Sequence, residues 1–278
     1  MTVTEQALAK LNLTLEIGQR RPDGYHELIS VMTCATLCDT ITLETSDDGK
    51  ITLTCDDPTL ACDERNLAYR AAQAFFGADD CPGVHLHLQK RIPMQAGLGG
   101  GSSDAAAVLR GLQRLYRTDK PLETLGAMLG SDVPFCVRGG TARCWGRGEQ
   151  MARVENMPKC WYVIVKPPEA HPTGAMYAAI DAQQPPRRHT TDALLAALTR
   201  GDLTGIADNL YNTFEAVLPA GSAIFTIREA LLHGGALNAM MSGSGSAVFG
   251  IFADGQTAQR AQEALQKTWE KTFLAESV

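Results

Sequence analysis

Apolar and polar side chains alternate over residues 8–17. Leucine and isoleucine occupy the odd positions from 11 to 17, and polar or charged residues occupy the even positions from 10 to 16. Successive side chains of a strand point to opposite faces, so a period of two predicts a strand with one face in the core. The polar face of this strand carries Lys10 and Asn12.

Similar patterns along the chain predict the remaining elements. Apolar runs predict further strands over 41–44, 51–55, 84–92 and 161–166. Apolar residues at helical spacing predict helices over 66–76, 103–115, 121–129, 174–180, 192–199 and 223–232. Turn-forming residues predict a loop over 19–24, and residues 135–145, with Gly139 and Gly140, resemble a returning hairpin. We expect the chain to end with a strand over 239–252 and a helix over 258–273.

These elements favour an α+β fold in two parts. Strands and helices follow one another without the strict alternation of a parallel α/β sheet. A polar break near Asn156 and Pro158 precedes the strand over 161–166. We therefore expect two domains, residues 1–156 and 157–278.

Composition narrows the class of protein. The 278 residues carry a net charge of −6 and 45% apolar residues, which is typical of a globular protein and leaves no basic stripe for nucleic acid. Neither a membrane span nor a signal segment is apparent, so we expect a cytoplasmic protein. The eight cysteines match no zinc pattern, and we expect free buried thiols.

A glycine-rich segment between a strand and a helix is the strongest chemical signal. Glycine occupies positions 97, 99, 100 and 101, directly before the helix predicted over 103–115. Glycines let backbone amides approach an anion, and the helix N-terminus adds unpaired donors and partial positive charge. No lysine follows, which excludes a P-loop, and Ser102 breaks the dinucleotide pattern. A simple strand-to-helix turn is the alternative, but three successive glycines are entropically costly. The segment predicts a phosphate site.

Three other segments carry candidate chemistry, each with an ordinary alternative. Lys10 is on a strand face that could simply meet solvent. Asp132 precedes Val-Pro and could simply cap a turn. Small residues over 242–246 again permit close backbone approach.

Together these segments resemble the GHMP kinase superfamily. The first strand, the Pro-x-x-x-Gly-Leu-Gly-x-x-Ser-Ser loop and a late glycine-rich stretch occur in the family's order. The narrower match, over 9–15, 21–28, 97–106, 130–135 and 242–246, is to members that phosphorylate the 2-hydroxyl of 4-diphosphocytidyl-2-C-methyl-D-erythritol with ATP, in non-mevalonate isoprenoid precursor biosynthesis. The resemblance implies an N-terminal ribosomal-protein-S5-like domain and a C-terminal ferredoxin-like α/β sandwich.

The resemblance also implies the roles of residues. Asp132 would accept the proton of the attacking hydroxyl, and Lys10 beside it would steady charge on the transferring group. The ATP phosphates, bridged by Mg²⁺, would be bound by the loop, and we expect no metal ligand among the protein side chains. The residues implied for ATP are Asn66, Lys90, Pro93, Met94, Gln95, Ala96, Gly97, Leu98, Gly99, Gly100, Gly101, Ser102 and Ser103, with Ser242, Gly243, Ser244 and Gly245 on the phosphate side.

Recognition of the substrate would involve a second set of residues. Tyr25 would stack on cytosine, His26 would hydrogen-bond its polar edge, and Asn12 would bind near the reacting hydroxyl. The implied substrate residues are Asn12, Tyr25, His26, Met32, Thr173 and Tyr177. Met32 and Tyr177 stand where relatives often have Phe, and each keeps an apolar or aromatic surface.

Three other functions fit the sequence less well. Another GHMP kinase, acting on mevalonate, homoserine or a sugar, would not need Tyr25 and His26. A sensor without kinase activity would have lost Lys10, Asp132 or the loop, and a plain nucleotide-binding module would not need the cytidine segment. The expected partner is a small molecule with a cytidine diphosphate group, with no nucleic acid and no membrane. Monomer and homodimer both remain open.

Overall fold

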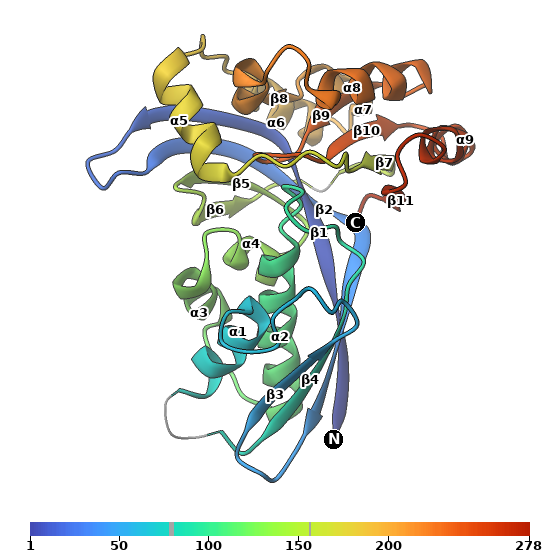
Figure 1. Cartoon of the computed structure of the whole chain (residues 1–278). Helices are drawn as coiled ribbons and strands as arrows, with labels where there is room; N and C mark the ends of the chain where they lie inside the picture. Colours follow the sequence, from blue (N-terminus) through green and yellow to red (C-terminus); the bar gives the residue numbers. More distant parts are fainter. Residues whose placement is uncertain (78–80, 156) are drawn as a thin grey trace. The chain divides into compact units, whose positions relative to one another are not determined.

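The computed structural model describes residues 1–77, 81–155 and 157–278 (Figure 1). The strands are β1 (Thr2–Arg20), β2 (His26–Thr45), β3 (Ile51–Cys55), β4 (Val84–Gln89), β5 (Thr141–Gly146), β6 (Gln150–Arg153), β7 (Trp161–Val165), β8 (Tyr211–Asn212), β9 (Asn238–Met241), β10 (Val248–Phe252) and β11 (Thr272–Glu276). The helices are α1 (Leu67–Phe76), α2 (Gly100–Tyr116), α3 (Leu122–Leu129), α4 (Val133–Arg138), α5 (Thr173–Gln183), α6 (Thr191–Thr199), α7 (Leu203–Asp208), α8 (Ala223–His233) and α9 (Gly255–Gln266), with a 3₁₀ turn at Thr213–Val217. Among the described residues, none of the helices has the length and apolar character that crossing a membrane requires.

Residue contacts divide the chain into two compact units. The first consists of Met1–Lys10, Cys38–Ile92 and Gly99–Gly139, and the second of Leu11–Leu37, Pro93–Leu98 and Gly140–Val278. The chain passes from one unit to the other within β1, within β2, on either side of residues 93–98, and between Gly139 and Gly140. The predicted boundary at Asn156 falls outside the described residues, and contiguous domains 1–156 and 157–278 stay a prediction.

In the first unit, helices pack on a sheet. β4 pairs with β3 in parallel and with residues 40–45 of β2 in the antiparallel sense. The apolar stripe predicted for α2 is buried, including Val108, Leu109 and Leu112. A Cβ atom on Gly111 would lie 2.4 Å from Leu43 Cδ1, so α2 presses directly on β2. This close packing fixes the helix that starts at the glycine segment.

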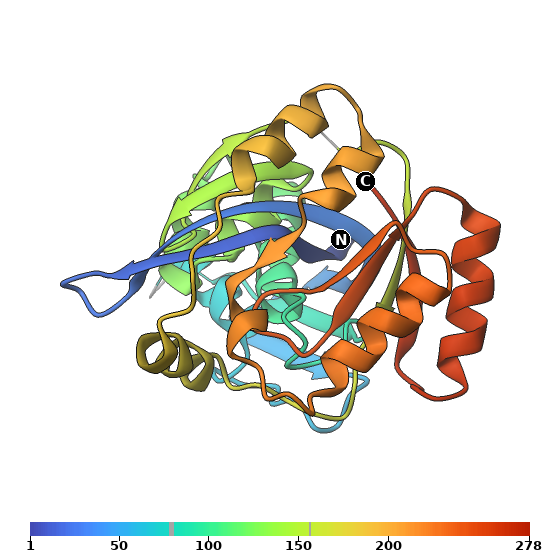
Figure 2. The same cartoon turned by 90° about the horizontal axis from the view of Figure 1, so that it is seen from above.

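The second unit contains an antiparallel sheet in the order β11-β7-β10-β9. Alternate residues of β7 and β10, among them Val163, Val165 and Val248, share one core with apolar side chains of α8 and α9. Both helices therefore cover the same face of this sheet (Figure 2). Elsewhere in this unit, β5 pairs with residues 28–33 of β2, and β8 pairs in parallel with residues 14 and 15 of β1.

Most predicted elements are confirmed. The strands over 51–55, 84–92 and 161–166 are β3, β4 and β7, and the helices over 66–76, 103–115, 121–129, 174–180, 192–199 and 223–232 are α1, α2, α3, α5, α6 and α8. The strand over 8–17 is the centre of the longer β1, and the one over 41–44 is the end of the longer β2.

The hairpin predicted over 135–145 is wrong. The chain instead forms α4 and then β5, with Gly139 and Gly140 between them at φ of 68° and 73°. A six-residue helix is too short to show helical periodicity, and positive φ values let the glycine pair turn a helix into a strand.

The end of the chain also differs from the prediction. The single strand expected over 239–252 is two antiparallel strands, β9 and β10, separated by the small residues from Ser242 to Ala247. The helix expected over 258–273 spans Gly255–Gln266, and the last apolar residues form β11 because they pair with β7.

Candidate active site

The glycine segment has the local geometry of an anion site. Gly99 is the N-cap of α2 with φ of 67°, and no side chain caps the helix start. A Cβ atom on Gly99 would lie 2.7 Å from Lys10 Cγ, so a larger residue has no room there. A Cβ on Gly101 would meet nothing within 4 Å. The start of α2 therefore combines uncapped amides with open space, which is what phosphate oxygens require.

The first half of the segment is anchored in the second unit. Ser242 Oγ donates to Gly97 O at 3.0 Å, and Ala247 N donates to Ala96 O at 3.0 Å. A Cβ atom on Gly97 would lie 2.0 Å from Ser242 O, and Gly97 has φ of 73°. The two glycine-rich stretches are therefore in direct contact at Gly97 and Ser242.

The other members of these stretches have different environments. Ala96 and Leu98 are buried, whereas Met94 and Gln95 are exposed. Gly243 O accepts a hydrogen bond from Asn212 Nδ2 at 2.8 Å, and Ser244 Oγ lies 2.9 Å from Thr173 Oγ1. Pro93, Gly100 and Ser102 are partly exposed, and Gly245 is buried. Ser103 is buried, and its hydroxyl donates to Leu8 O at 2.6 Å, which ties α2 to β1.

The predicted catalytic pair is brought together in the first unit. Lys10 lies on β1 and Asp132 directly before α4, and their Nζ and Oδ2 atoms are 3.6 Å apart. The Lys10 side chain is 6% exposed and that of Asp132 is 32% exposed. Asp132 makes no side-chain capping bond to α4. The two ordinary alternatives, a solvated lysine and a capping aspartate, are therefore both excluded.

Asn12 is held in place by its neighbours in the second unit. Its Nδ2 donates to Ser30 Oγ at 2.9 Å, and its backbone amide donates to Ser242 Oγ at 3.4 Å. Ser30 was not predicted, because its contact with Asn12 joins two strands and leaves no local pattern. Lys10 and Asn12 are two residues apart on one strand and so share a strand face.

Two of the residues predicted to bind cytidine, His26 and Tyr177, are in contact with each other. Tyr25 is 55% exposed, and the Arg147 guanidinium lies 5.1 Å from the centre of its ring. His26 is buried and stacks on Tyr177, with ring centroids 4.9 Å apart. His26 Nε2 lies 2.7 Å from Oδ1 of Asp181, a residue that the sequence did not indicate. Tyr177 and Asp181 are four residues apart on α5 and so lie on one helix face, which holds the imidazole.

Three of the predicted residues are held in the fold by their surroundings. Met32 is 3% exposed inside the sheet. Asn66 caps α1, accepting from Ala68 N at 3.0 Å, and its Nδ2 donates to Ala61 O at 2.8 Å. Lys90 is bonded to the carboxylates of Asp39 and Asp104. Contacts of Asn66 and Lys90 with ATP, and of Met32 with substrate, stay predictions.

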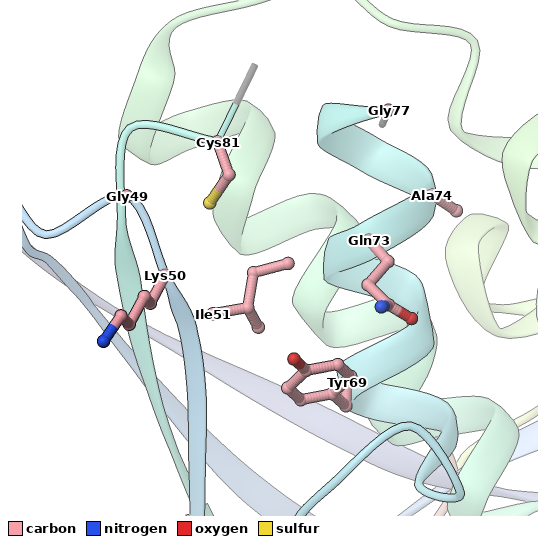
Figure 3. A pocket seen from close by; sticks show the side chains of 8 residues that line it. All are labelled: Gly49, Lys50, Ile51, Tyr69, Gln73, Ala74, Gly77 and Cys81. Atoms are coloured by element: carbon pink, nitrogen blue, oxygen red, sulfur yellow. The ribbon is translucent and has the colours of Figure 1, made fainter. Parts of the chain in front are cut away.

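A hollow of about 710 Å³ in the first unit does not contain these residues. Figure 3 shows Tyr69 and Gln73 projecting from α1 near Ile51 of β3, with Cys81 at the rim. In the described part of the chain, no group of three or more His, Cys, Asp or Glu side chains could hold a metal ion. No disulfide joins the eight cysteines, of which four are buried and Cys62 is exposed, so the expectation of buried thiols holds only in part.

Comparison with known proteins identifies the family. Residues 66–140 match the GHMP kinases N terminal domain and residues 194–271 the GHMP kinases C terminal domain. The 4-diphosphocytidyl-2-C-methyl-D-erythritol kinase of Moorella thermoacetica is 42% identical, with 99% of each chain covered, and that of Exiguobacterium sibiricum is 41% identical, with 99% of this chain and 97% of the relative covered.

Solved structures agree with this result. A 4-(cytidine 5'-diphospho)-2C-methyl-D-erythritol kinase structure has a TM-score of 0.85 and 36% identity, covering 99% of this chain and 98% of that chain. The mevalonate kinase of L. major, with a TM-score of 0.78, 16% identity and 100% and 96% coverage, shares the fold. The chain therefore belongs to the GHMP kinases and, within them, to the 4-diphosphocytidyl-2-C-methyl-D-erythritol kinase family.

Proposed function

We propose that this protein transfers the γ-phosphoryl group of ATP to the 2-hydroxyl of 4-diphosphocytidyl-2-C-methyl-D-erythritol. The products are the 2-phosphate and ADP, and the reaction is a step of non-mevalonate isoprenoid precursor biosynthesis in the cytoplasm. Relatives about 40% identical over nearly their whole length carry the name of this kinase.

The observation that carries the proposal is the position of Lys10. Its Nζ lies 3.6 Å from Asp132 Oδ2, and its Cγ lies beside Gly99, the N-cap of α2. An acceptor for a proton, a cation and the amides of a helix start are thus gathered within the first unit. Phosphoryl transfer needs this combination, since it depends on positioning and charge stabilisation more than on a strong base.

Each group has a defined part in the reaction. The 2-hydroxyl oxygen attacks the γ-phosphorus while the bond from that phosphorus to the β,γ-bridging oxygen breaks. Asp132 accepts the proton of the hydroxyl, and the bond electrons leave with ADP. The Lys10 ammonium stabilises negative charge on the transferring group, and amides at the start of α2 bind the phosphate oxygens.

Mg²⁺ fits this site as a partner of ATP. Magnesium keeps several waters and is commonly bound through one or two carboxylates together with substrate phosphates, rather than by a cage of protein ligands. When bound, the ion would neutralise charge on the β- and γ-phosphates.

Tyr25, His26, Thr173 and Tyr177 supply the proposed recognition of the cytidine group. The exposed ring of Tyr25 is accessible for stacking on a base. The bond from His26 Nε2 to Asp181 leaves Nδ1 as the ring atom for the polar edge of cytosine.

A coupled assay of ADP release tests the proposal. We expect turnover with 4-diphosphocytidyl-2-C-methyl-D-erythritol and little or none with mevalonate or homoserine. Preference for mevalonate or homoserine would assign the protein to another GHMP activity. ATP binding without turnover of any of them would exclude kinase activity on these substrates.

A further inference from the structure

Three buried charged residues form a cluster beneath the start of α2. Lys90 Nζ donates to Oδ2 of Asp39 and, at 2.7 Å, to Oδ2 of Asp104. The side chains of Lys90, Asp39 and Asp104 are 9%, 0% and 4% exposed. A Cβ atom on Gly100 would lie 3.5 Å from Lys90 Nζ, so the ammonium lies directly against the first residue of the helix.

The cluster connects the two ends of the glycine segment. Asp39 Oδ1 accepts from the backbone amides of Arg91 and, at 2.8 Å, of Ile92, where the chain enters the segment. Asp104 is in α2, where the chain leaves the segment. Lys90 is bonded to both carboxylates and therefore holds the entry and the exit together.

Burial and the neighbouring charges together shift the pKa values of Asp104 and Lys90. Burial is the main cause that raises the pKa of Asp104 to about 7, where the Lys90 ammonium opposes the rise and the Asp39 carboxylate adds to it. Burial acts to lower the pKa of Lys90, but the two carboxylates outweigh it and the pKa is raised. Asp104 Oδ1 is buried with no hydrogen-bond partner in the described part of the chain, which adds to the cost of ionising this carboxyl.

We propose that Lys90, held by Asp39 and Asp104, is a positioning residue for ATP. It clamps together the two ends of the glycine segment, so that the amides at the start of α2 are preorganised. This inference rests on the proposed binding of ATP at that segment. It differs from a direct contact between Lys90 and the nucleotide, because it requires both carboxylates.

Four variants separate the clamp from a direct contact. Lys90→Met removes the ammonium, Asp39→Asn sets an amide donor against it, and Asp104→Ala removes its second acceptor. Asp104→Asn keeps an acceptor for Lys90 and serves as the conservative rescue. Lys50→Met and Asp119→Asn make matched changes at exposed residues of the same unit.

ATP affinity by calorimetry is the first readout. We expect Lys90→Met, Asp39→Asn and Asp104→Ala each to weaken ATP binding about ten-fold or more, because a preorganised site loses affinity when it must be ordered on binding. Asp104→Asn and the two exposed controls should remain within about three-fold of the parent. In steady-state assays, KM for ATP should rise while kcat stays within a few-fold, since Lys10 and Asp132 are unchanged.

Hydrogen exchange of the ATP-free protein is the second readout. Amides of Arg91, Ile92 and the first turn of α2 should exchange faster in the three disrupting variants and at the parental rate in Asp104→Asn. If Lys90→Met does not fold, the comparison of Asp104→Ala with Asp104→Asn decides.

Weakened ATP binding in Lys90→Met alone, with parental affinity in Asp39→Asn and Asp104→Ala, would overturn the clamp in favour of a direct contact. Parental exchange at both ends of the segment in all variants would also overturn it. ATP binding by the parent protein distinguishes failure of the clamp from failure of the proposed function. If the parent does not bind ATP, the proposed function is wrong. If the parent binds ATP and the three disrupting variants bind it with the same affinity, the clamp is wrong.

Discussion

Asp132 is the residue whose surroundings differ most from those of an ordinary turn-forming aspartate. It precedes α4 at the capping position, yet its carboxylate makes no capping bond and faces the Lys10 ammonium at 3.6 Å. A carboxylate kept away from the helix amides remains available as a proton acceptor. This arrangement is the residue-scale basis of the proposed chemistry.

Removing either member of this pair should reduce turnover. Asp132→Ala or Lys10→Ala should lower kcat by about 10² or more, because their interactions strengthen in the transition state. ATP affinity should stay within a few-fold. Rates from the ADP-release assay and affinities from calorimetry check this, with exposed Asp119→Ala as the control. Near-normal turnover in Asp132→Ala would remove it from the role of proton acceptor.

Tyr25 should determine affinity for the cytidine substrate and not for ATP. Its ring is 55% exposed, and stacking of a base on an aromatic ring is worth about 1–3 kcal/mol. Tyr25→Ala should raise KM for the cytidine substrate roughly ten-fold and leave KM for ATP nearly unchanged. Tyr25→Phe, which keeps the ring, should have a mild effect. Equal weakening of both substrates in Tyr25→Ala would contradict this role.

Asp104 should make stability depend on pH. Its pKa is raised from the ordinary 3.8 to about 7, chiefly by burial, so the folded protein keeps a proton that the unfolded chain releases. The stabilisation is complete below about pH 4 and is lost as the pH rises to about 7. The free energy of unfolding should therefore fall more between pH 5 and pH 8 in the parent than in Asp104→Asn. Urea unfolding at both pH values measures this difference, and identical changes in the two proteins would refute it.

At the scale of elements, sequence patterns predicted those that are long and periodic. The alternation in β1 and the apolar stripe of α2 are both present because one face of each is buried. The short α4 and the strand β11 were missed, since six residues show no clear period and β11 depends on pairing with β7. Local pattern therefore identifies an element better than it identifies the element's partners.

The same limit applies to the site. Lys10, Asp132 and the glycine segment carry family motifs and were predicted. Asp39 and Asp181 were missed, because their partners Lys90 and His26 lie 51 and 155 residues away and no local pattern marks such pairs.

The start of α2 offers a direct test of nucleotide binding. Gly101→Ala adds a methyl group that meets no protein atom within 4 Å, so the fold should be retained. An alanine in a helix is more favourable than glycine by roughly 0.5–1 kcal/mol, so stability should not fall. If phosphates bind there, KM for ATP should rise about ten-fold, because the methyl group blocks their approach.

The control for this test is Gly221→Ala, a glycine that also has open space around it. It should leave both the melting temperature and KM for ATP unchanged. Unchanged ATP affinity in a folded Gly101→Ala protein would move the nucleotide away from this helix start. Gly99→Val is less informative, because it would also displace Lys10.

At the scale of the whole molecule, the residues proposed for recognition and those proposed for chemistry belong to different units. Tyr25, His26 and Tyr177 belong to the second unit, and Lys10 and Asp132 to the first. Binding energy from a remote part of a substrate can be used to position its reacting group. The cytidine diphosphate group should therefore contribute to turnover as well as to affinity.

Methylerythritol without its cytidine diphosphate group tests this. It retains the reacting hydroxyl but loses the contacts proposed with Tyr25, His26 and Tyr177, so we expect kcat/KM to fall by about 10³ or more, with part of the loss in kcat. Adding free cytidine diphosphate should not restore turnover, since the two fragments are no longer joined and their relative freedom must again be lost on binding. The measurement is ADP release at saturating ATP over a range of methylerythritol concentrations. Comparable efficiency for free methylerythritol and the cytidine-linked compound would mean that the second unit's aromatic residues serve another purpose.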